Sequence, residues 1–194
     1  PLGRDEVAAV FRDAHPTVPL LALNRTSIAV PSGSASFSLS PEDDGIAAAE
    51  FLLARNAKRV LVLTGNDEGM RRAAAALRDR LAERGGAVVD SLDVGADALA
   101  FQPRLQAAVK KAGAVDAVFL AMRASEARMV APLLNSAGLA GKPRVATSQL
   151  LAGTGVKASD DMVLDGIAYP TEPWTARGVS GLPSAGSVAS RLKS

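Results

Sequence analysis

Short apolar runs alternate with longer amphipathic stretches through the middle of this chain. The runs cover Arg59–Thr64, Ala87–Val94, Val115–Met122 and Arg144–Thr147, and they are rich in Val, Leu or Ile. The stretches between them repeat their apolar residues at helical spacing. Strands of a parallel sheet are almost continuously apolar because helices cover both faces of the sheet. The pattern therefore predicts an α/β fold with a parallel sheet and helices on both of its faces.

The helix before the first run has the clearest start signal. Ser40 is placed to cap it, Pro41 suits its first position, and the next three residues are acidic. We expect this helix to continue to about Asn56. Its inward face is predicted to carry Ile46, Ala49, Leu52 and Leu53.

Weaker signals mark the elements at either side of this core. A helix over Arg4–His15 and a buried strand over Val18–Leu23 are predicted near the start of the chain. Ser125 is expected to cap a later helix that contains Pro132. A proline in a helix interior costs ~3 kcal/mol, so we expect a kink at Pro132 or two short helices. A last strand is predicted over Val163–Tyr169.

Composition agrees with a globular protein and excludes several kinds of site. Of the 194 residues, 48% are hydrophobic and 22% are charged, and the formal net charge is only +2. There is no cysteine, so disulfides and thiolate metal sites are excluded. The one basic cluster lacks the interleaved aromatic residues of a single-strand binder, which favours a solvated helix face over nucleic-acid binding. That cluster consists of Arg71, Arg72, Arg78, Arg80 and Arg84.

The motifs of catalysis and cofactor binding are weak or missing. His15 is the single histidine, so a metal site is disfavoured, and we expect His15 to bond backbone carbonyls at a helix end. Ser148 follows a predicted strand, but the sequence has no Gly-x-Ser-x-Gly elbow around it. The glycine-bearing loops at 65–69 and 153–155 match neither the dinucleotide nor the phosphate-loop fingerprint. We therefore expect no catalytic residue, metal or cofactor.

Polar residues at the ends of the predicted strands are the candidates for a binding site. Side chains at the carboxyl ends of parallel strands line the ligand crevice of such folds. Hydroxyl, amide and guanidinium groups suit a carboxylate or a peptide-like ligand. The alternative is that these residues bond loop backbone and one another. The candidates are Asn24, Arg25, Thr64, Asn66, Arg123, Thr147, Ser148 and Gln149.

The order and spacing of several phrases resemble the C-terminal domain of the LpoA/LppC family. These phrases are Val18–Arg25, Leu39–Asp43, Val60–Thr64, Phe119–Arg123, Ala127-Arg128, Ala146–Ser148, Leu164–Ile167 and Pro173-Trp174. Members of this family are outer-membrane lipoproteins that activate a bifunctional penicillin-binding protein. The resemblance implies a type I periplasmic-binding fold, in which two α/β lobes are joined by hinge strands.

The resemblance also implies a division of the chain. Residues 1–56 would be the later part of lobe one and the crossover helix. Residues 57–168 would be lobe two, a complete α/β unit, and residues 169–194 would be the hinge exit and the return toward lobe one. Three positions depart from the family pattern: Glu68-Gly69 stands where Trp-Gly is usual, Gln149 where His is common, and Thr171 where the family has Asp.

The function implied is that of a non-catalytic periplasmic regulator. It would bind and stimulate a class A penicillin-binding protein, a peptidoglycan synthase, and the full-length protein would be anchored to the inner leaflet of the outer membrane by a lipid. The alternative is a periplasmic solute-binding protein for an amino acid or small peptide, because the same fold serves both roles. A doubly wound enzyme is a third alternative, disfavoured by the missing glycine fingerprint.

Overall fold

A computed structural model describes residues 4–13, 18–24, 26, 28–36, 40–95, 97–151, 161–171, 178, 180–181 and 183–184. The predictions for His15, Arg25 and Pro173-Trp174 therefore fall outside the described residues. Within them, the predicted α/β architecture is confirmed, and its centre is a five-stranded parallel sheet. The strands are β3 (Arg59–Thr64), β4 (Ala87–Asp93), β5 (Ala117–Ala121), β6 (Arg144–Ala146) and β7 (Ile167–Ala168).

The order of the strands in the sheet is β4-β3-β5-β6-β7. β5 is the middle strand, and its neighbour β3 pairs with β4 on one side and with β5 on the other. The chain therefore leaves β3 toward one edge, returns, and continues from β5 toward the other edge. The carboxyl ends of β3 and β5 meet where this direction reverses, and such a switch point is where open parallel sheets bind ligands.

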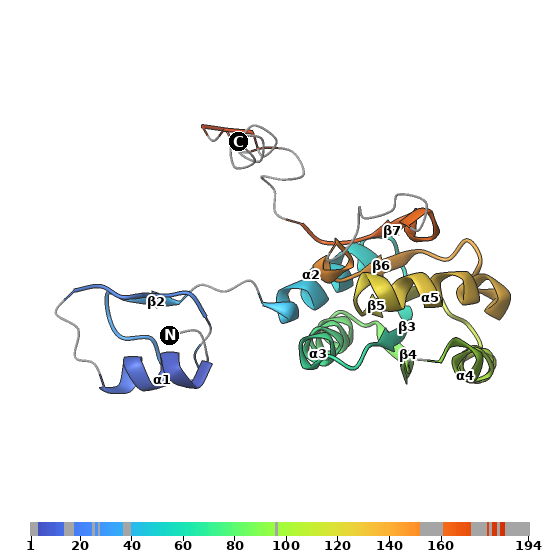
Figure 1. Cartoon of the computed structure of the whole chain (residues 1–194), viewed down its shortest axis with the longest axis horizontal. Helices are drawn as coiled ribbons and strands as arrows, with labels where there is room; N and C mark the ends of the chain where they lie inside the picture. Colours follow the sequence, from blue (N-terminus) through green and yellow to red (C-terminus); the bar gives the residue numbers. More distant parts are fainter. Residues whose placement is uncertain are drawn as a thin grey trace.

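Helices cover both faces of the sheet, as Figure 1 shows. α2 (Pro41–Leu53) and α3 (Glu68–Glu83) pack on one face, and α4 (Ala98–Ala112) and α5 (Ala124–Leu134) on the other. The residues of β3 alternate between the two cores, since Val60 and Val62 face α2 and α3 while Leu61 and Leu63 face the other helices. Burial on both faces explains why every residue of β3 after Arg59 is buried.

Helix α2 starts as predicted and packs very closely against α3. Ser40 caps it by accepting the N–H of Glu42 at 3.2 Å, and Pro41 is its first residue. The predicted inward face is partly wrong, because Ile46 is 41% exposed and the helix ends at Leu53. Small residues face inward instead: Gly45, Ala48 and Ala49, together with Leu52. They let the backbones of the two helices approach each other.

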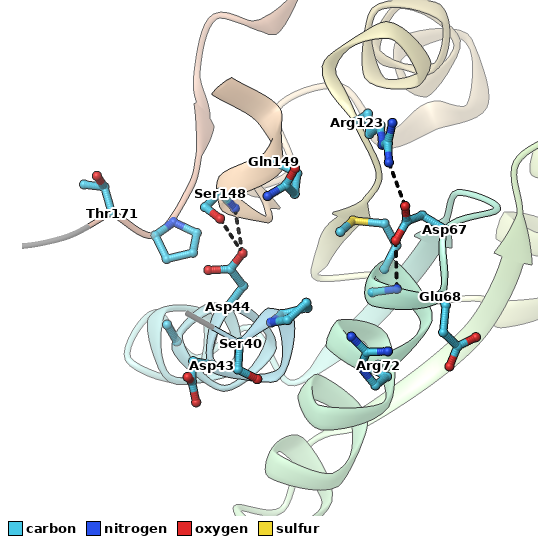
Figure 2. Close-up of a pocket in the computed structure, with 15 residues that line it drawn as sticks. Ser40, Asp43, Asp44, Asp67, Glu68, Arg72, Arg123, Ser148, Gln149 and Thr171 are labelled. Atoms are coloured by element: carbon cyan, nitrogen blue, oxygen red, sulfur yellow. Dashed lines mark hydrogen bonds and ion pairs between the residues drawn. The ribbon is translucent and has the colours of Figure 1, made fainter. Parts of the chain in front are cut away.

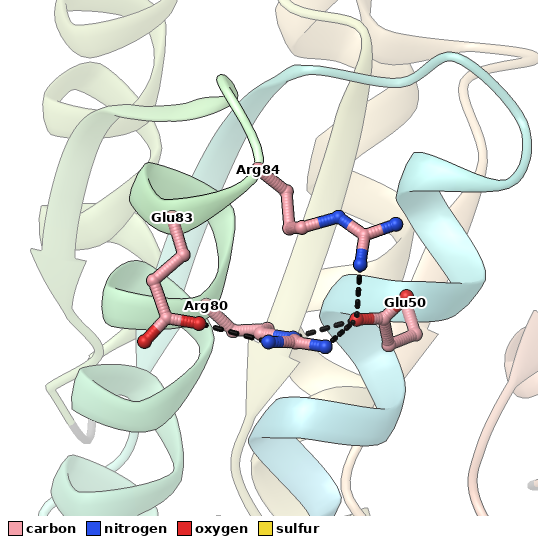
Figure 3. A network of polar contacts seen from close by, with 4 residues as sticks. All are labelled: Glu50, Arg80, Glu83 and Arg84. Atoms are coloured by element: carbon pink, nitrogen blue, oxygen red, sulfur yellow. Dashed lines mark hydrogen bonds and ion pairs between the residues drawn. The ribbon is translucent and has the colours of Figure 1, made fainter.

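The arginine cluster lies along α3 and forms ion pairs at the surface. Figure 3 shows Glu50 of α2 in contact with Arg80 of α3 and with Arg84, the C-cap residue of that helix. Arg80 Nε donates to Glu50 Oε1 at 2.6 Å, and Arg84 lies 3.9 Å from the same oxygen. Arg80 also bonds Glu83, and these hydrogen bonds to Glu83 and Glu50 raise the pKa of Arg80. The cluster thus includes a surface link between two helices.

The region around α5 differs from its prediction in two ways. Ser125 is not the cap: α5 begins at Ala124, and Glu126 accepts the N–H of the N-cap residue Arg123 at 3.1 Å. α5 continues through Pro132 to Leu134, so the predicted division into two short helices is wrong, while the alternative, a kink at Pro132, stays a prediction. Pro132 is exposed near the end of the helix, so its missing N–H disturbs only the last turn. The chain then forms a wider turn, η1 (Asn135–Leu139), which contains Gly138 at φ 82°.

The elements near the two ends are shorter than predicted. Instead of one strand over Val163–Tyr169, a 3₁₀ turn, η3 (Met162–Leu164), precedes β7, and Gly166 between them has φ 81°. The buried strand over Val18–Leu23 is also wrong, because β1 (Leu21–Ala22) has two residues and Leu21 is 65% exposed. β1 pairs in parallel with β2 (Ala35–Ser36). Helix α1 (Arg4–Asp13) buries Val7, Ala8 and Phe11.

Candidate functional site

A pocket of about 640 Å³ opens at the carboxyl ends of the central strands. Its wall is built by the start of α2, the first turn of α3, Arg123 between β5 and α5, the first residues of η2 (Ser148–Leu151) and Pro170-Thr171. Figure 2 shows two pairs of polar side chains from separate elements directed toward each other, Asp44 with Ser148 and Asp67 with Arg123. The pocket thus lies at the switch point of the sheet, where this topology places ligand crevices.

One wall of the pocket is an ion pair across the switch point. Asp67 follows β3 and Arg123 follows β5, and Arg123 Nη2 donates to Asp67 Oδ2 at 2.8 Å. The other oxygen of Asp67 accepts the N–H of Gly69 at 2.8 Å and so caps α3. The bond from Gly69 and the pairing with Arg123 hold the pKa of Asp67 below its ordinary value of 3.8. Asp67 is therefore ionised at neutral pH.

The opposite wall contains a second carboxylate, which accepts two hydrogen bonds. Asp44 lies in the first turn of α2, and its Oδ2 accepts the backbone N–H of Ser148 at 2.9 Å and the Ser148 hydroxyl at 2.7 Å. Ser148 is the first residue of η2, which follows β6. The two residues are 104 positions apart in the sequence. This contact ties the start of α2 to the carboxyl end of β6, as the dashed lines in Figure 2 show.

The lining of the pocket carries more acidic than basic groups. Among the described residues, four carboxylates and two guanidinium groups contribute to the wall, which gives this part of the lining an acidic excess. Arg72 Nε lies 3.2 Å from Glu42 Oε1, so that cation also has an acidic neighbour. The carboxylates are Asp43, Asp44, Asp67 and Glu68, and the guanidinium groups are those of Arg72 and Arg123.

Three of the eight predicted cleft residues line this pocket: Arg123, Ser148 and Gln149. Thr64 and Thr147 are buried instead, and the Thr147 hydroxyl donates to Met70 Sδ at 3.5 Å. Asn66 is exposed in the turn before α3 and does not line the pocket. Asn24 belongs to the segment after β1 and is also absent from the wall, and Arg25 lies outside the described residues. Contact between any of them and a ligand stays a prediction.

Asp44 and Asp67 were not among the predicted site residues. Acids at helix starts are typical of caps, and Asp67 does cap α3. A usable signal existed for Asp67, because it follows β3 just as Arg123 follows β5 and these strands are neighbours. Asp44 offered no such signal, since its contact with Ser148 depends on how α2 packs beside β6.

The arrangement offers little bond-making chemistry within the described residues. No group of three or more His, Cys, Asp or Glu side chains is placed there to hold a metal ion. Among the described residues the Ser148 hydroxyl donates to the carboxylate of Asp44, whereas an activated serine nucleophile donates to a general base such as an imidazole. In the same part of the chain no helix combines the length and the apolar character needed to span a bilayer.

Comparison with known proteins supports the fold. The sequence matches no family model, and none of the curated proteins matches it either. Among solved structures, the LpoA (YraM) C-domain from Haemophilus influenzae, a regulator of PBP1A, aligns with all of this chain and 60% of its own, at a TM-score of 0.77 and 16% identity. The chain has a periplasmic-binding-protein-like fold.

Transport proteins share this fold with the chain. A protein from Chromobacterium violaceum assigned to branched-chain amino acid ABC transport aligns with 77% of this chain and 47% of its own, at a TM-score of 0.60 and 29% identity. An ABC transporter substrate-binding protein from Desulfitobacterium hafniense aligns with 75% of this chain and 41% of its own, at a TM-score of 0.56 and 20% identity. The chain therefore spans between two fifths and three fifths of the lengths of these three proteins.

Proposed function

We propose that this chain is part of a non-catalytic periplasmic regulator that binds and stimulates a bifunctional peptidoglycan synthase, a class A penicillin-binding protein. The observation that supports this most is the extent of the structural match. The LpoA C-domain, a regulator of PBP1A, aligns with the entire chain, whereas the two transport proteins align with about three quarters of it. Their TM-scores of 0.60 and 0.56 are also lower than 0.77.

The chemistry of the pocket agrees with a regulator that acts through contact. Ser148 and Arg123 engage carboxylates of the same chain, Asp44 and Asp67, and these bonds join separate elements of the fold. A domain braced in this way presents a defined surface to a partner. In this proposal the protein works from the periplasm in cell-wall synthesis, and its full-length form is attached to the outer membrane by a lipid.

Solute binding is the second candidate, and two observations favour it. The Chromobacterium protein assigned to branched-chain amino acid transport has the highest identity of the three compared structures, 29%. A pocket of about 640 Å³ also lies at the switch point of the sheet, and ligand pockets commonly have volumes of ~300–1,000 Å³. In this alternative the strand-end candidates contact an amino acid or a small peptide.

The test of the regulator uses the full-length protein with its cognate synthase. Glycan polymerisation and peptide crosslinking are followed with a fixed amount of synthase and increasing amounts of the protein. The proposal expects at least one of the two rates to rise and then saturate. Rates that stay at those of the synthase alone would overturn it.

A core variant supplies the matched control for this experiment. Leu61 is completely buried at the centre of the sheet, so Leu61→Asp places a charge in the core and is expected to unfold this domain. The full-length protein with this substitution should fail to stimulate. Circular dichroism checks that the domain is unfolded in this variant. If the unfolded variant still stimulated the synthase, the effect would belong to another part of the protein.

A further inference from the structure

The pocket contains two sets of hydrogen-bond donors that suit a carboxylate ligand. One set is the backbone N–H and hydroxyl of Ser148, and the other is the guanidinium group of Arg123. Backbone N–H, hydroxyl and guanidinium groups form the short, charge-assisted bonds by which proteins hold carboxylates. Both sets lie on elements that follow strands of the sheet, β6 and β5, as expected of residues that receive a ligand.

Each set is already engaged by a carboxylate of the chain itself. Asp44 Oδ2 accepts hydrogen bonds from the N–H and the hydroxyl of Ser148, at 2.9 and 2.7 Å. Asp67 Oδ2 accepts one from Arg123 Nη2 at 2.8 Å. Asp44 lies in the first turn of α2 and Asp67 is the N-cap of α3, and Figure 2 shows each acid directly beside the donor that it bonds. In both pairs a helix start supplies the acid and a strand end supplies the donor.

The acids are also held in place by the fold. Asp67 is the N-cap of α3 through its bond with Gly69, and Asp44 is fixed in the first turn of α2 behind the Ser40 cap. A ligand carboxylate would have to displace a side-chain carboxyl group that already accepts hydrogen bonds from the same donors. It would also enter a wall that has four carboxylates and two guanidinium groups. Unpaired like charges brought together in a partly desolvated pocket repel one another.

We propose that Asp44 and Asp67 occupy the positions of a ligand carboxylate, so that the pocket excludes free amino acids and other small carboxylates. The two acids therefore determine specificity by occupying the donors of Ser148 and Arg123. Their removal converts the pocket into a carboxylate-binding site. This inference goes beyond the proposed regulatory function and does not depend on it. Stimulation of a synthase and binding of leucine are separate properties, and each is measured in its own experiment.

The experiment compares ligand binding by the wild type with binding by the double variant Asp44→Ala/Asp67→Ser, in which a gain of binding is expected. Alanine frees both donors of Ser148, while serine still caps α3 but is too short to reach Arg123. Thermal shift and calorimetry are run with acetate, leucine and leucinamide at millimolar concentrations. The variant is expected to bind acetate and leucine at least about tenfold more tightly than the wild type, since hydrogen bonds to charged groups are strong. Leucinamide, which has no carboxylate, should produce no such gain.

The control variant Asp43→Ala/Glu68→Ala removes the same charge from the same two helix starts. Asp43 and Glu68 also line the pocket, but neither accepts a hydrogen bond from Ser148 or Arg123 in the described contacts. This variant should bind leucine no better than the wild type. An equal gain in both variants would show that charge alone is responsible, and it would overturn the inference.

Two further results would also overturn it. One is leucine binding by the wild type with an affinity similar to that of Asp44→Ala/Asp67→Ser. The other is a folded double variant that binds neither acetate nor leucine. If the double variant does not fold, Asp67→Ser alone supplies the test, because it keeps the cap of α3 and frees Arg123. Failure to stimulate a synthase changes none of these outcomes, so the two proposals fail separately.

Discussion

Gly45 of α2 lies directly against the backbone of Ala73 in α3. A Cβ atom at Gly45 would stand 2.1 Å from the carbonyl oxygen of Ala73 and 3.0 Å from the backbone nitrogen of Leu77. These are backbone atoms, so no side-chain rotation can relieve the overlap. The close approach of the two helices therefore requires glycine at this position.

The substitution Gly45→Ala should separate α2 from α3 and destabilise the protein. Overpacking of a tight contact costs about 1–3 kcal/mol, which exceeds the gain in helix propensity from glycine to alanine. Urea unfolding at neutral pH measures the change in the free energy of unfolding. Gly95→Ala is the control, since a Cβ there meets nothing within 4 Å, and it should change stability little. Equal stability of the two variants would contradict this account of the α2–α3 contact.

Asp67 should make stability depend on pH in the acid range. Its pKa is lowered in the folded protein, so its ionised form stabilises the fold above the ordinary value of 3.8, and this contribution disappears as the pH falls through the folded pKa. Asp67→Asn keeps a capping oxygen but cannot ionise. The wild type should therefore be more stable than Asp67→Asn at pH 7, and the difference should shrink below pH 3.8.

Urea unfolding of both proteins between pH 7 and pH 3 measures that difference. A gap that is as large at pH 3 as at pH 7 would contradict the proposed stabilisation of ionised Asp67. High salt offers a second check, because Arg123 is 61% exposed and the exposed part of its attraction to Asp67 is screened. The gap at pH 7 should become smaller in high salt.

Arg128 should anchor Asp161, the residue directly before η3. Its Nε and Nη2 atoms both donate to Asp161 Oδ1, at 3.0 and 2.6 Å, and both side chains are partly buried. Hydrogen bonds between charged groups in such surroundings contribute about 1.5–3 kcal/mol. Arg128→Ala is expected to lower the free energy of unfolding by about this amount.

A double-mutant cycle with Asp161→Ala isolates the pair. The effects of Arg128→Ala and Asp161→Ala should be strongly non-additive, because each removes the same interaction. Arg78→Ala, which alters an exposed arginine of α3, is a control and should combine additively with Asp161→Ala. Additive effects of Arg128→Ala and Asp161→Ala would mean that the two bonds contribute little.

The strands of the sheet could be predicted because a strand that is buried on both faces shows as a short apolar run in the sequence. β3 has the predicted bounds, since each residue after Arg59 is covered on its own face. Met70 and Leu77 of α3 are buried as their helical spacing predicts. The inward face of α2 was harder, because Ile46 is more apolar than Gly45 but only glycine fits beside Ala73. A contact between the backbones of two helices cannot be recognised from the pattern of apolar residues in the sequence.

The candidate site was harder to predict than the sheet. Neighbouring strand ends place Arg123 and Ser148 at one edge, and that much follows from topology. The direction of a side chain does not. Thr64 continues the face of β3 that holds Val60 and Val62, and Thr147 points to Met70 beneath α3, so both are buried. The bond between Asp44 and Ser148 joins residues 104 positions apart and needs the packed structure.

The crosslinking rate of the cognate class A synthase tests the central proposal most directly. It is measured with saturating amounts of the full-length protein, in the presence and absence of millimolar leucine. A regulator of this kind should raise the rate, and leucine should leave the increase unchanged. An unaltered rate, together with tight binding of leucine to the wild-type protein, would contradict the account and favour a solute-binding role.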